Sequence, residues 1–402
     1  MTHTRRAALL GLALMLAACG SPTSAASSSA GTTQSPAASP SPSPAPVESA
    51  VYLAHSQTSP STSAWALHQV DVVAGGVPQD RVIASGSSCC RQLLTAGHGS
   101  AVVLDGNSVS GADTVQVVDL TTGQGRSLGP ESSMGIGAPG PVGAAMSPDG
   151  SQIAIGGGHR IVVVELSSGA IRRLVSSPDH FFMPLRWTPS GIVTNEVPYA
   201  DGGPYRYDLL SIDPTSGAAT KLRSHPVEAI SPDARTVSVA VNTNLGDSSC
   251  ALQFPCANTL TMGEVGGQDA VVVKQKYRNF APLSVSDSGE LLYVSDTFPN
   301  DSGSAALAPD MGLYVAVGVK LSQQFPEHFI GEWEGGALLD PSTALVGHVR
   351  GTSLNSETGI ELLLVHLCPE PMAGCQASSV VVSFTPGHWP TVFDPIIPIS
   401  TT

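Results

Sequence analysis

The stretch GAAMSPDGSQIAIGGGHRIVVVELSSGAIRRLV, residues 143–175, has the pattern of one small sheet with four short strands. Ser147-Pro148-Asp149-Gly150 predicts a turn after the first strand, and Ser167-Ser168-Gly169 predicts another between the third and fourth. Pro and Gly set the geometry of such turns, and the β-branched runs between them are typical of strands. The stretch therefore predicts a four-stranded antiparallel unit.

Copies of this unit recur along the chain at a steady period. The turns between the third and fourth predicted strands fall at glycines spaced by 48, 46, 48 and 49 residues. A period in this range indicates propeller blades, each a small sheet that must pack against its neighbours. The turn glycines are Gly75, Gly123, Gly169, Gly217 and Gly266. The other full copies occupy 93–128, 185–222, 229–274, 283–325 and 337–384.

The copy nearest the N-terminus, at 51–84, is short and accounts for three strands only. Its missing first strand can come from HWPTVFDPI at 388–396, which follows the last full copy. The sequence therefore predicts an all-β fold, a seven-bladed β-propeller of four-stranded blades. The ring is closed by a C-terminal strand that joins the N-terminal blade. Six or eight blades, or an irregular pair of β-sandwiches, are the alternatives at this point.

The turn SPDG at 147–150, followed by VVELSSG, resembles the WD40-like (PD40) repeats of TolB-like propellers. The resemblance covers about 51–396 and implies the propeller fold. TolB itself has an extra α/β domain before its propeller, whereas this chain has only a tether there. The role of TolB in an envelope-spanning complex is therefore not carried over. The other copies depart from SPDG as Ser231-Pro232-Asp233-Ala234, Thr188-Pro189-Ser190-Gly191 and Ser286-Asp287-Ser288-Gly289.

The N-terminus, MTHTRRAALLGLALMLAACG, has the pattern of an export signal. Arg5 and Arg6 precede an apolar run that is too short to span a bilayer. The run ends in Leu16-Ala17-Ala18-Cys19, which resembles the lipobox of bacterial lipoproteins. We therefore expect a signal peptide at 1–18, with lipid on Cys19 anchoring the chain to the outer face of the cytoplasmic membrane. An ordinary secretory signal is the alternative, and both general and twin-arginine export stay open.

Residues 19–49 are almost wholly Ser, Pro, Ala, Thr and Gly after the cysteine. Such a segment cannot bury an apolar face, so we expect a disordered tether. The propeller is then expected over 50–402. It would be a monomeric ectodomain.

Six cysteines remain once Cys19 is assigned to lipid, an even number for an oxidising compartment. Two pairs are close enough in sequence to bridge loops locally, Cys250 with Cys256 and Cys368 with Cys375. Cys89 and Cys90 are left as a vicinal pair by elimination only. Two free thiols, or pairing with the other four cysteines, are the alternatives.

Composition and motifs exclude several functions. The chain has 18 Lys and Arg against 32 Asp and Glu, a net charge of −14 that argues against nucleic-acid binding. Gly135–Gly140 matches GxGxxG, but Pro141 and a predicted strand follow it where a dinucleotide site needs a helix.

We predict no catalytic residue, metal or cofactor. The histidines that might approach the ring axis are His55, His98, His348 and His366, each more commonly structural. Asp149 and Asp233 are expected to bind their own turn backbone.

These observations favour a binding or scaffolding propeller, anchored to the membrane by lipid, with an envelope protein or cell-wall component as partner. Three insertions between second and third strands interrupt the repeat, and one carries Tyr199, Tyr205, Arg206 and Tyr207, which have the chemistry of interfaces. The insertions are Tyr199–Tyr207, Asn242–Asn258 and Thr297–Pro309. The alternative is a lactonase- or hydrolase-like propeller enzyme with a metal in the axial channel. A third possibility is an accessory protein that works only inside a larger complex.

Overall fold

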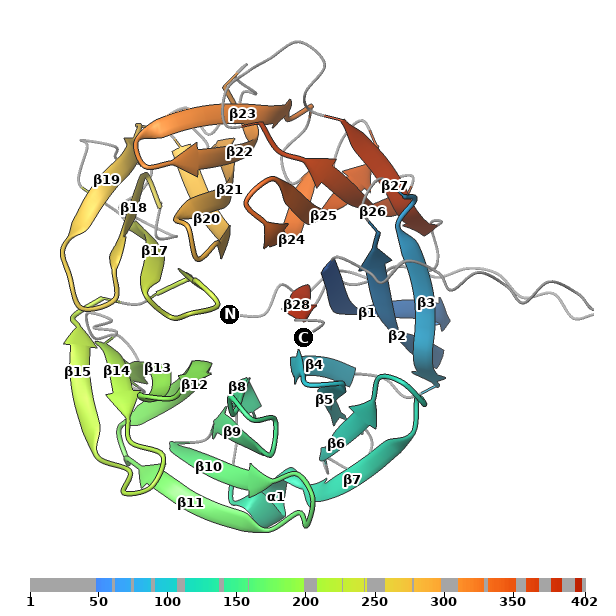
Figure 1. Cartoon of the computed structure of the whole chain (residues 1–402), viewed down its shortest axis with the longest axis vertical. Coiled ribbons are helices and arrows are strands. Elements are labelled where there is room, and N and C mark those ends of the chain that lie inside the picture. The colour runs from blue at the N-terminus through green and yellow to red at the C-terminus, as the bar shows by residue number, and fades with distance from the viewer. Residues whose placement is uncertain are drawn as a thin grey trace, which may run out of the picture. The chain divides into compact units, whose positions relative to one another are not determined.

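Seven four-stranded antiparallel sheets are arranged as blades around a central axis in the computed structural model (Figure 1). The predicted seven-bladed propeller is therefore confirmed. The described residues all belong to a unit spanning Pro44–Thr402, while none of Met1–Ser43, the other unit, is described. The structure describes residues 48–59, 62–73, 76–87, 91–106, 113–136, 141–157, 159–198, 208–225, 227–241, 243, 257–276, 278–297, 310–328, 332–351, 359–368, 377–384 and 395–399.

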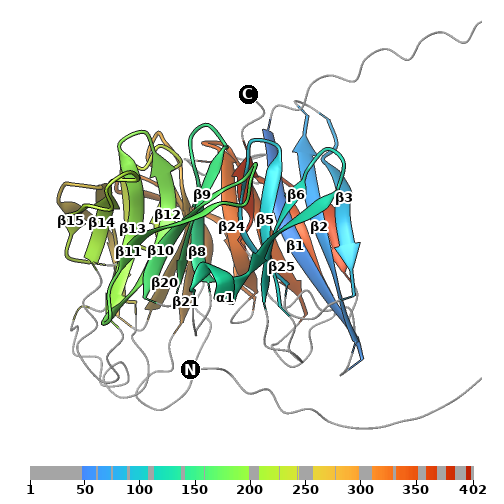
Figure 2. The same cartoon turned by 90° about the horizontal axis from the view of Figure 1, so that it is seen from below.

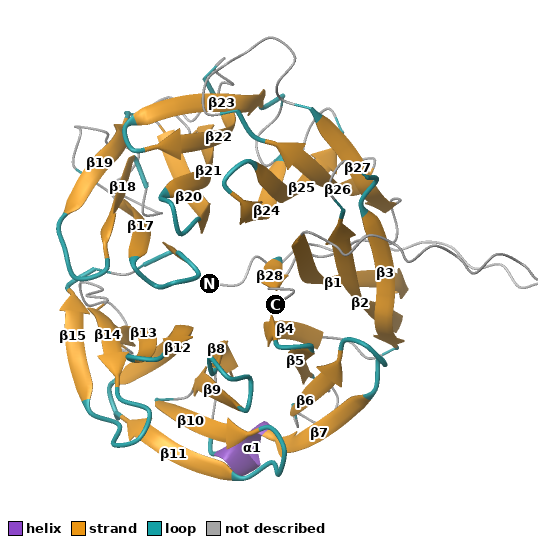
Figure 3. Ribbon diagram, viewed as in Figure 1, coloured by secondary structure: helices purple, strands orange, loops and turns teal. Residues whose placement is uncertain are grey.

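Each blade runs from an innermost strand near the axis to an outermost strand at the rim (Figure 3). Blade 1 contains β28 (Ile397–Ile399), β1 (Glu48–Ser59), β2 (Thr62–Val72) and β3 (Gln79–Gly86). Blade 2 contains β4 (Arg91–Gly97), β5 (Ser100–Asp105), β6 (Thr114–Asp119) and β7 (Gly125–Pro130). Blade 3 contains β8 (Pro141–Met146), β9 (Gln152–Gly157), β10 (Arg160–Glu165) and β11 (Ile171–Ser176). A short helix, α1 (Glu131–Met134), joins blades 2 and 3.

The remaining four blades repeat this order. Blade 4 contains β12 (His180–Thr188), β13 (Gly191–Pro198), β14 (Asp208–Ile212) and β15 (Ala219–Arg223). Blade 5 contains β16 (Ala229–Ile230), β17 (Thr236–Val241), β18 (Thr259–Glu264) and β19 (Asp269–Lys274). Blade 6 contains β20 (Arg278–Val285), β21 (Glu290–Thr297), β22 (Gly312–Val317) and β23 (Lys320–Pro326). Blade 7 contains β24 (Trp333–Asp340), β25 (Thr343–Arg350), β26 (Gly359–His366) and β27 (Ser378–Phe384).

The core consists of apolar clusters that each fill the space between two neighbouring blades. Because side chains alternate along a strand, β1 sends Val51 and Leu53 toward blade 2 and Ala50 and Tyr52 toward blade 7. The same division holds around the ring, with one cluster at each of the seven blade-to-blade contacts. Blades are thus buried on both faces, and their middle strands supply most of the apolar side chains in these clusters.

The closing strand pairs with the N-terminal blade as expected, although it lies further along the chain than predicted. β28 runs antiparallel to β1, with Val51 opposite Ile397 and Ser49 opposite Ile399. Residues 388–394 of the predicted strand lie outside the described residues, and Pro395 and Ile396 precede the strand. Ile397 and Ile399 pack on the cluster between blades 1 and 2. Pro398 is tolerated because an innermost strand has a free edge toward the axis.

Turn chemistry repeats with the blades. The hydroxyl oxygens of Ser147, Ser231 and Ser286 each accept a hydrogen bond from the backbone N–H at the start of the next strand. Between third and fourth strands, Gly123 and Gly217 have φ of +72° and +74°. A Cβ at Gly217 would lie 2.3 Å from the carbonyl oxygen of Leu174 in the preceding blade, so only glycine lets this turn dock there.

The two faces of the ring differ in what they carry. Glu48 and Ile399 lie on the face with the tight turns that join first to second and third to fourth strands, which we call the turn face. The opposite face, which we call the connection face, carries α1 (Figure 2). Second strands also end at this face and third strands begin there, and the three predicted insertions fall in sequence between these strands in blades 4, 5 and 6, almost wholly outside the described residues. Among the described residues, no helix has the length and apolar character needed to cross a membrane.

We predict that ending the chain at Asp394, which removes β28, destabilises the ring by an amount on the order of 3–6 kcal/mol. The truncation exposes the clusters that Ile396, Ile397 and Ile399 cover and leaves the inner edge of β1 unpaired. Calorimetry should show a melting temperature lower by several degrees, with faster amide exchange in β1. A chain ending at Ile399 is the control and should melt as the full chain does.

Candidate functional site

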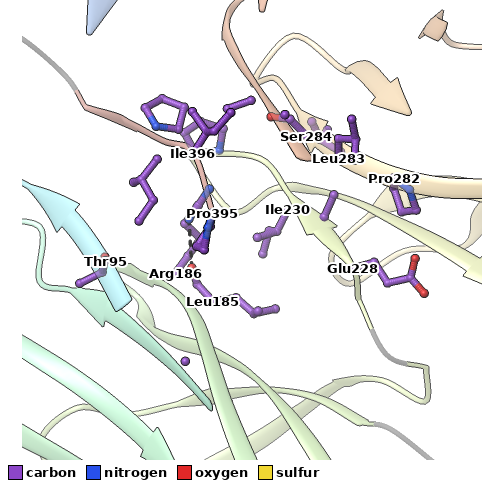
Figure 4. A pocket seen from close by; sticks show the side chains of 18 of the residues that line it. Thr95, Leu185, Arg186, Glu228, Ile230, Pro282, Leu283, Ser284, Pro395 and Ile396 are labelled. Atoms are coloured by element: carbon purple, nitrogen blue, oxygen red, sulfur yellow. Dashed lines mark hydrogen bonds between the residues drawn. The ribbon is translucent and has the colours of Figure 1, made fainter. Parts of the chain in front are cut away.

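The innermost strands of all seven blades surround an axial cavity of about 370 Å³. Most of its wall is apolar and comes from short stretches of the innermost strands (Figure 4). The closing strand completes this wall with Pro395–Pro398, so the cavity exists in this form only when the ring is closed. A concave, largely apolar site with few polar groups is the usual form of a ligand pocket. The apolar side chains labelled in Figure 4 are Leu185, Ile230, Pro282, Leu283, Pro395 and Ile396.

Arg186 and Glu228 are the charged side chains among the residues that line this cavity. They belong to neighbouring blades, since Arg186 lies in β12 and Glu228 directly precedes β16. The view in Figure 4 places them on either side of Ile230. Thr95 and Ser284 add hydroxyl groups to the wall. The cavity thus combines an apolar surface with one basic and one acidic group.

Arg186 occupies an irregular point of its strand. The register of β12 against β13 shifts between Pro184 and Arg186, and the first strands β4, β20 and β24 show a similar shift against their second strands. The guanidinium Nη1 donates to the carbonyl oxygen of Leu185 at 3.1 Å, and Nε is buried without a hydrogen-bond partner in the described part of the chain. Burial lowers the pKa of this guanidinium, and the charge of Asp287 opposes that effect. Arginine nevertheless stays charged at any physiological pH.

Glu228 is reached by water within the cavity, yet the walls of the ring surround its carboxyl group. This desolvation raises the pKa of Glu228 to about 7. A hydrogen bond from the Ala240 backbone favours the charged form and lowers the pKa, but its effect is smaller. The group therefore changes charge near neutral pH, when ordinary glutamates are fully ionised. Its backbone N–H donates to Ser238 in the next strand at 3.1 Å, which holds its main chain in place.

The acidic turn residues hold the turn face together, as predicted. Asp149 accepts hydrogen bonds from the Ser147 and Ser151 hydroxyls and from the Ser151 N–H, and these lower its pKa to about 2. The Asp233 carboxylate likewise accepts hydrogen bonds from the Ser231 hydroxyl and from the backbone N–H of Arg235. The Asp233 N–H also donates to the Asp287 carboxylate at 2.8 Å, which links blades 5 and 6. These carboxylates serve turn geometry and show no arrangement for catalysis.

The candidate histidines do not approach the axis, so that hypothesis is wrong. Only innermost strands reach the axis, whereas these histidines lie in other positions of their blades. His55 and His348 are in second strands, His366 ends a third strand, and His98 lies in a turn with φ of +47°. His348 instead bonds the buried Glu332, with Nε2 3.1 Å from Oε1. No described group of three or more His, Cys, Asp or Glu side chains could hold a metal ion.

Most of the other predicted site residues lie outside the described residues. Cys368 is described: it is fully buried and disulfide-bonded, and Gln324 of blade 6 holds its backbone through two hydrogen bonds of 2.8 and 2.9 Å. Its predicted partner, Cys375, is not described, so the pairing stays a prediction. The residues outside the described ranges are Cys19, Cys89, Cys90, Tyr199, Tyr205, Arg206, Tyr207, Cys250, Cys256 and Cys375.

Sequence reasoning missed Arg186 and Glu228, although a signal for both exists. Aligning the copies on their first turn places Arg186 level with Ala145, Ala229 and Ser284. Glu228 falls level with apolar residues of the same strand in other copies, such as Leu185. A charge at a position that other blades fill with small or apolar residues marks a departure from the packing pattern. Charged residues in the first strand of a copy are therefore the sequence signal that could have indicated this site.

A second cavity, of about 560 Å³, lies on blade 1 beside Phe384 of β27. The small side chains of Ala54, Ala64 and Ala66 leave this space. Within blade 1, the buried His68 directs Nδ1 to Asp80 at 2.8 Å, and the Tyr52 hydroxyl donates to the same carboxylate at 3.1 Å. The Tyr52 and His68 rings stack at 4.7 Å, so this network is part of the packing of blade 1.

We predict that Glu228→Gln makes the protein more stable at pH 8 but not at pH 4.5. The folded protein holds the Glu228 proton more tightly than the unfolded chain, so stability falls as the pH rises from about 4.5 to about 7. Glutamine removes that loss, which is on the order of 1 kcal/mol because cavity water screens the charge. Urea unfolding at several pH values should show the difference appearing across this window. Exposed Glu264→Gln is the control and should follow the native profile.

No family model and no curated protein matches this sequence. Solved structures do match its fold. A protein from Lactobacillus plantarum is 10% identical over 88% of this chain and 100% of its own, with a TM-score of 0.52. Oligogalacturonate lyase from Vibrio parahaemolyticus is 11% identical over 84% and 86%, with a TM-score of 0.50. TolB from Acinetobacter baumannii is 14% identical over 68% and 61%, with a TM-score of 0.43, so the chain spans less than two thirds of TolB. Such identities show a shared propeller fold alone.

Proposed function

We propose that this protein is a lipid-anchored, extracytoplasmic binding propeller whose partner is an envelope protein or a cell-wall component. The observation that carries the proposal is the axial cavity, which is walled by all seven blades and holds only a few polar groups. Such a site is built to bind, because its charged groups are isolated from each other rather than assembled into a reacting cluster. The export signal and Cys19 supply the proposed location.

The polarity of the ring supports an orientation for this module. The described chain begins at Glu48 on the turn face, so a tether from Cys19 would reach that face first. At about 3.1 Å per residue for an extended Pro-rich chain, the residues between Cys19 and Glu48 span roughly 90 Å. The connection face would then be the face offered to a partner.

The alternative of a lactonase- or hydrolase-like enzyme has less support. An axial metal would need several carboxylates or imidazoles converging from different blades. The residues that line the described cavity offer Glu228 as their one carboxylate and no imidazole. We therefore prefer the binding function.

The anchor is tested by Cys19→Ser. Because the thioether to lipid forms at this sulfur, the substitution should abolish labelling by radioactive palmitate and move the protein from the membrane fraction to the soluble exported fraction. Ser21→Ala, two residues further on, is the matched control and should stay at the membrane. A Cys19→Ser protein that remains labelled would exclude lipidation at this residue.

The binding face is tested by photo-crosslinking in intact cells. A photoreactive amino acid at His225 or Lys276, which are exposed on the connection face, should give one discrete adduct with an envelope component. The same probe at Thr121 or Thr215, exposed on the turn face, should give none. Adducts of equal yield from both faces, or none from either, contradict the proposed orientation and binding function.

A further inference from the structure

Arg186 is an incompletely bonded cation in the wall of a largely apolar cavity. Its single hydrogen bond within the described part of the chain runs from Nη1 to Leu185, and Nε is buried without a partner. No carboxylate of the described residues comes within 4.0 Å of the guanidinium, although Asp287 is near enough to act on its charge. The other buried arginines differ, because Arg91, Arg223 and Arg278 each contact an aspartate directly.

This contrast indicates what the Arg186 position lacks. A buried guanidinium is costly unless an anion and hydrogen-bond acceptors satisfy it. The three other arginines each have a carboxylate in contact, from Asp105, Asp269 and Asp310, although Nε of Arg91 and of Arg223 lacks a partner in the described part of the chain just as Nε of Arg186 does. Among the described residues, the only acceptor in contact with the Arg186 guanidinium is the backbone carbonyl of Leu185, so its outer N–H groups can serve a ligand in the cavity.

We propose that the axial cavity binds the carboxylate of a small apolar acid, or of an apolar chain end, through the Arg186 guanidinium. This inference rests on the proposed binding function and names the ligand chemistry of its site. A guanidinium presents parallel N–H groups that match the two oxygens of a carboxylate. The apolar part of the ligand would lie against Leu185, Ile230 and Leu283, which line the same cavity.

A second charged residue and the size of the cavity limit which ligands it can bind. Glu228 is the other charged residue that lines the cavity, and its ionised form would repel a carboxylate. Replacing it with glutamine should therefore leave the affinity for an anion unchanged or increase it. The size of the cavity, about 370 Å³, falls within the range of small-molecule pockets and admits a short chain but no folded domain.

The test uses hexanoate as the probe and hexanamide as its uncharged counterpart of the same shape. Calorimetric titration of the exported chain should show hexanoate binding at least tenfold more tightly than hexanamide. Arg186→Gln should remove that tenfold preference, while Arg186→Lys should keep part of it because the charge remains without the fork. Arg126→Gln, at an exposed arginine of β7, is the matched control and should bind as the native chain does.

A second readout separates binding from folding. The ¹⁵Nε–H resonance of Arg186, assigned by its loss in Arg186→Gln, should move on addition of hexanoate and not of hexanamide. Equal binding of both probes, or an unmoved resonance, would overturn the proposal and leave Arg186 as a partner of Asp287 at long range. The same conclusion follows if Arg186→Gln lowers stability but leaves the preference for hexanoate intact.

A pair of peptides distinguishes the two sources of the carboxylate. Pentaalanine with a free C-terminus should bind more tightly than hexanoate if a chain end is the ligand, and its amidated form should then bind no better than hexanamide. Hexanoate binding more tightly than both peptides would indicate a free small acid. Crosslinks from the connection face together with no carboxylate binding would retain the binding function and reject this inference alone.

Discussion

The structure depends on the burial of both faces of every blade against its neighbours. A four-stranded sheet with two apolar faces cannot be stable in water by itself, and each fully buried Val, Ile or Leu side chain contributes roughly 1.5–3 kcal/mol only when a neighbour covers it. The ring satisfies this requirement seven times, since every cluster is shared by two adjacent sheets. Blades 1 and 7 share such a cluster as well. The strand β28, which follows blade 7 in the chain, pairs with β1 of blade 1 and so closes the ring.

The same constraint determines where chemistry can occur. The side chains of middle strands are mostly taken up by packing between blades, and those of the outer strands are largely exposed. The innermost strands have a free edge toward the axis and together line one shared cavity. A charge placed there, such as Arg186 or Glu228, faces this shared space and not the interface between two blades. The site is therefore a product of ring closure as much as of the residues that line it.

Much of the fold could be predicted from the sequence because the repeated turns have strong local signals. The Ser147–Gly150 turn, the glycines at a steady spacing and the three-strand first copy together favour seven blades and a closing strand, and the structure confirms both. The closing strand itself was misplaced. Aromatic and β-branched residues at 388–396 have the better strand pattern, whereas Ile397-Pro398-Ile399 is held by tertiary packing that no local pattern records.

The site could be predicted far less well. Residue type drew attention to the histidines, yet a residue reaches the axis through its strand position within the blade, and none of the four is in a first strand. Arg186 and Glu228 were overlooked for the converse reason, since they occupy first strands but match no catalytic motif. A raised carboxyl pKa arises from the surrounding walls, and those walls come from residues that lie as far apart in the sequence as Leu94 and Pro398.

The pairing of β1 with strands on both sides has a mechanical consequence. Any pull on the chain ahead of Glu48 acts along the length of β1, which β2 and β28 flank in antiparallel ladders. The load is then shared by many hydrogen bonds sheared at once rather than opened one after another. The innermost strand β28 shares this load through its hydrogen bonds to β1. A pull on the chain ahead of Glu48 would therefore meet resistance along the whole of β1 before blade 1 opens.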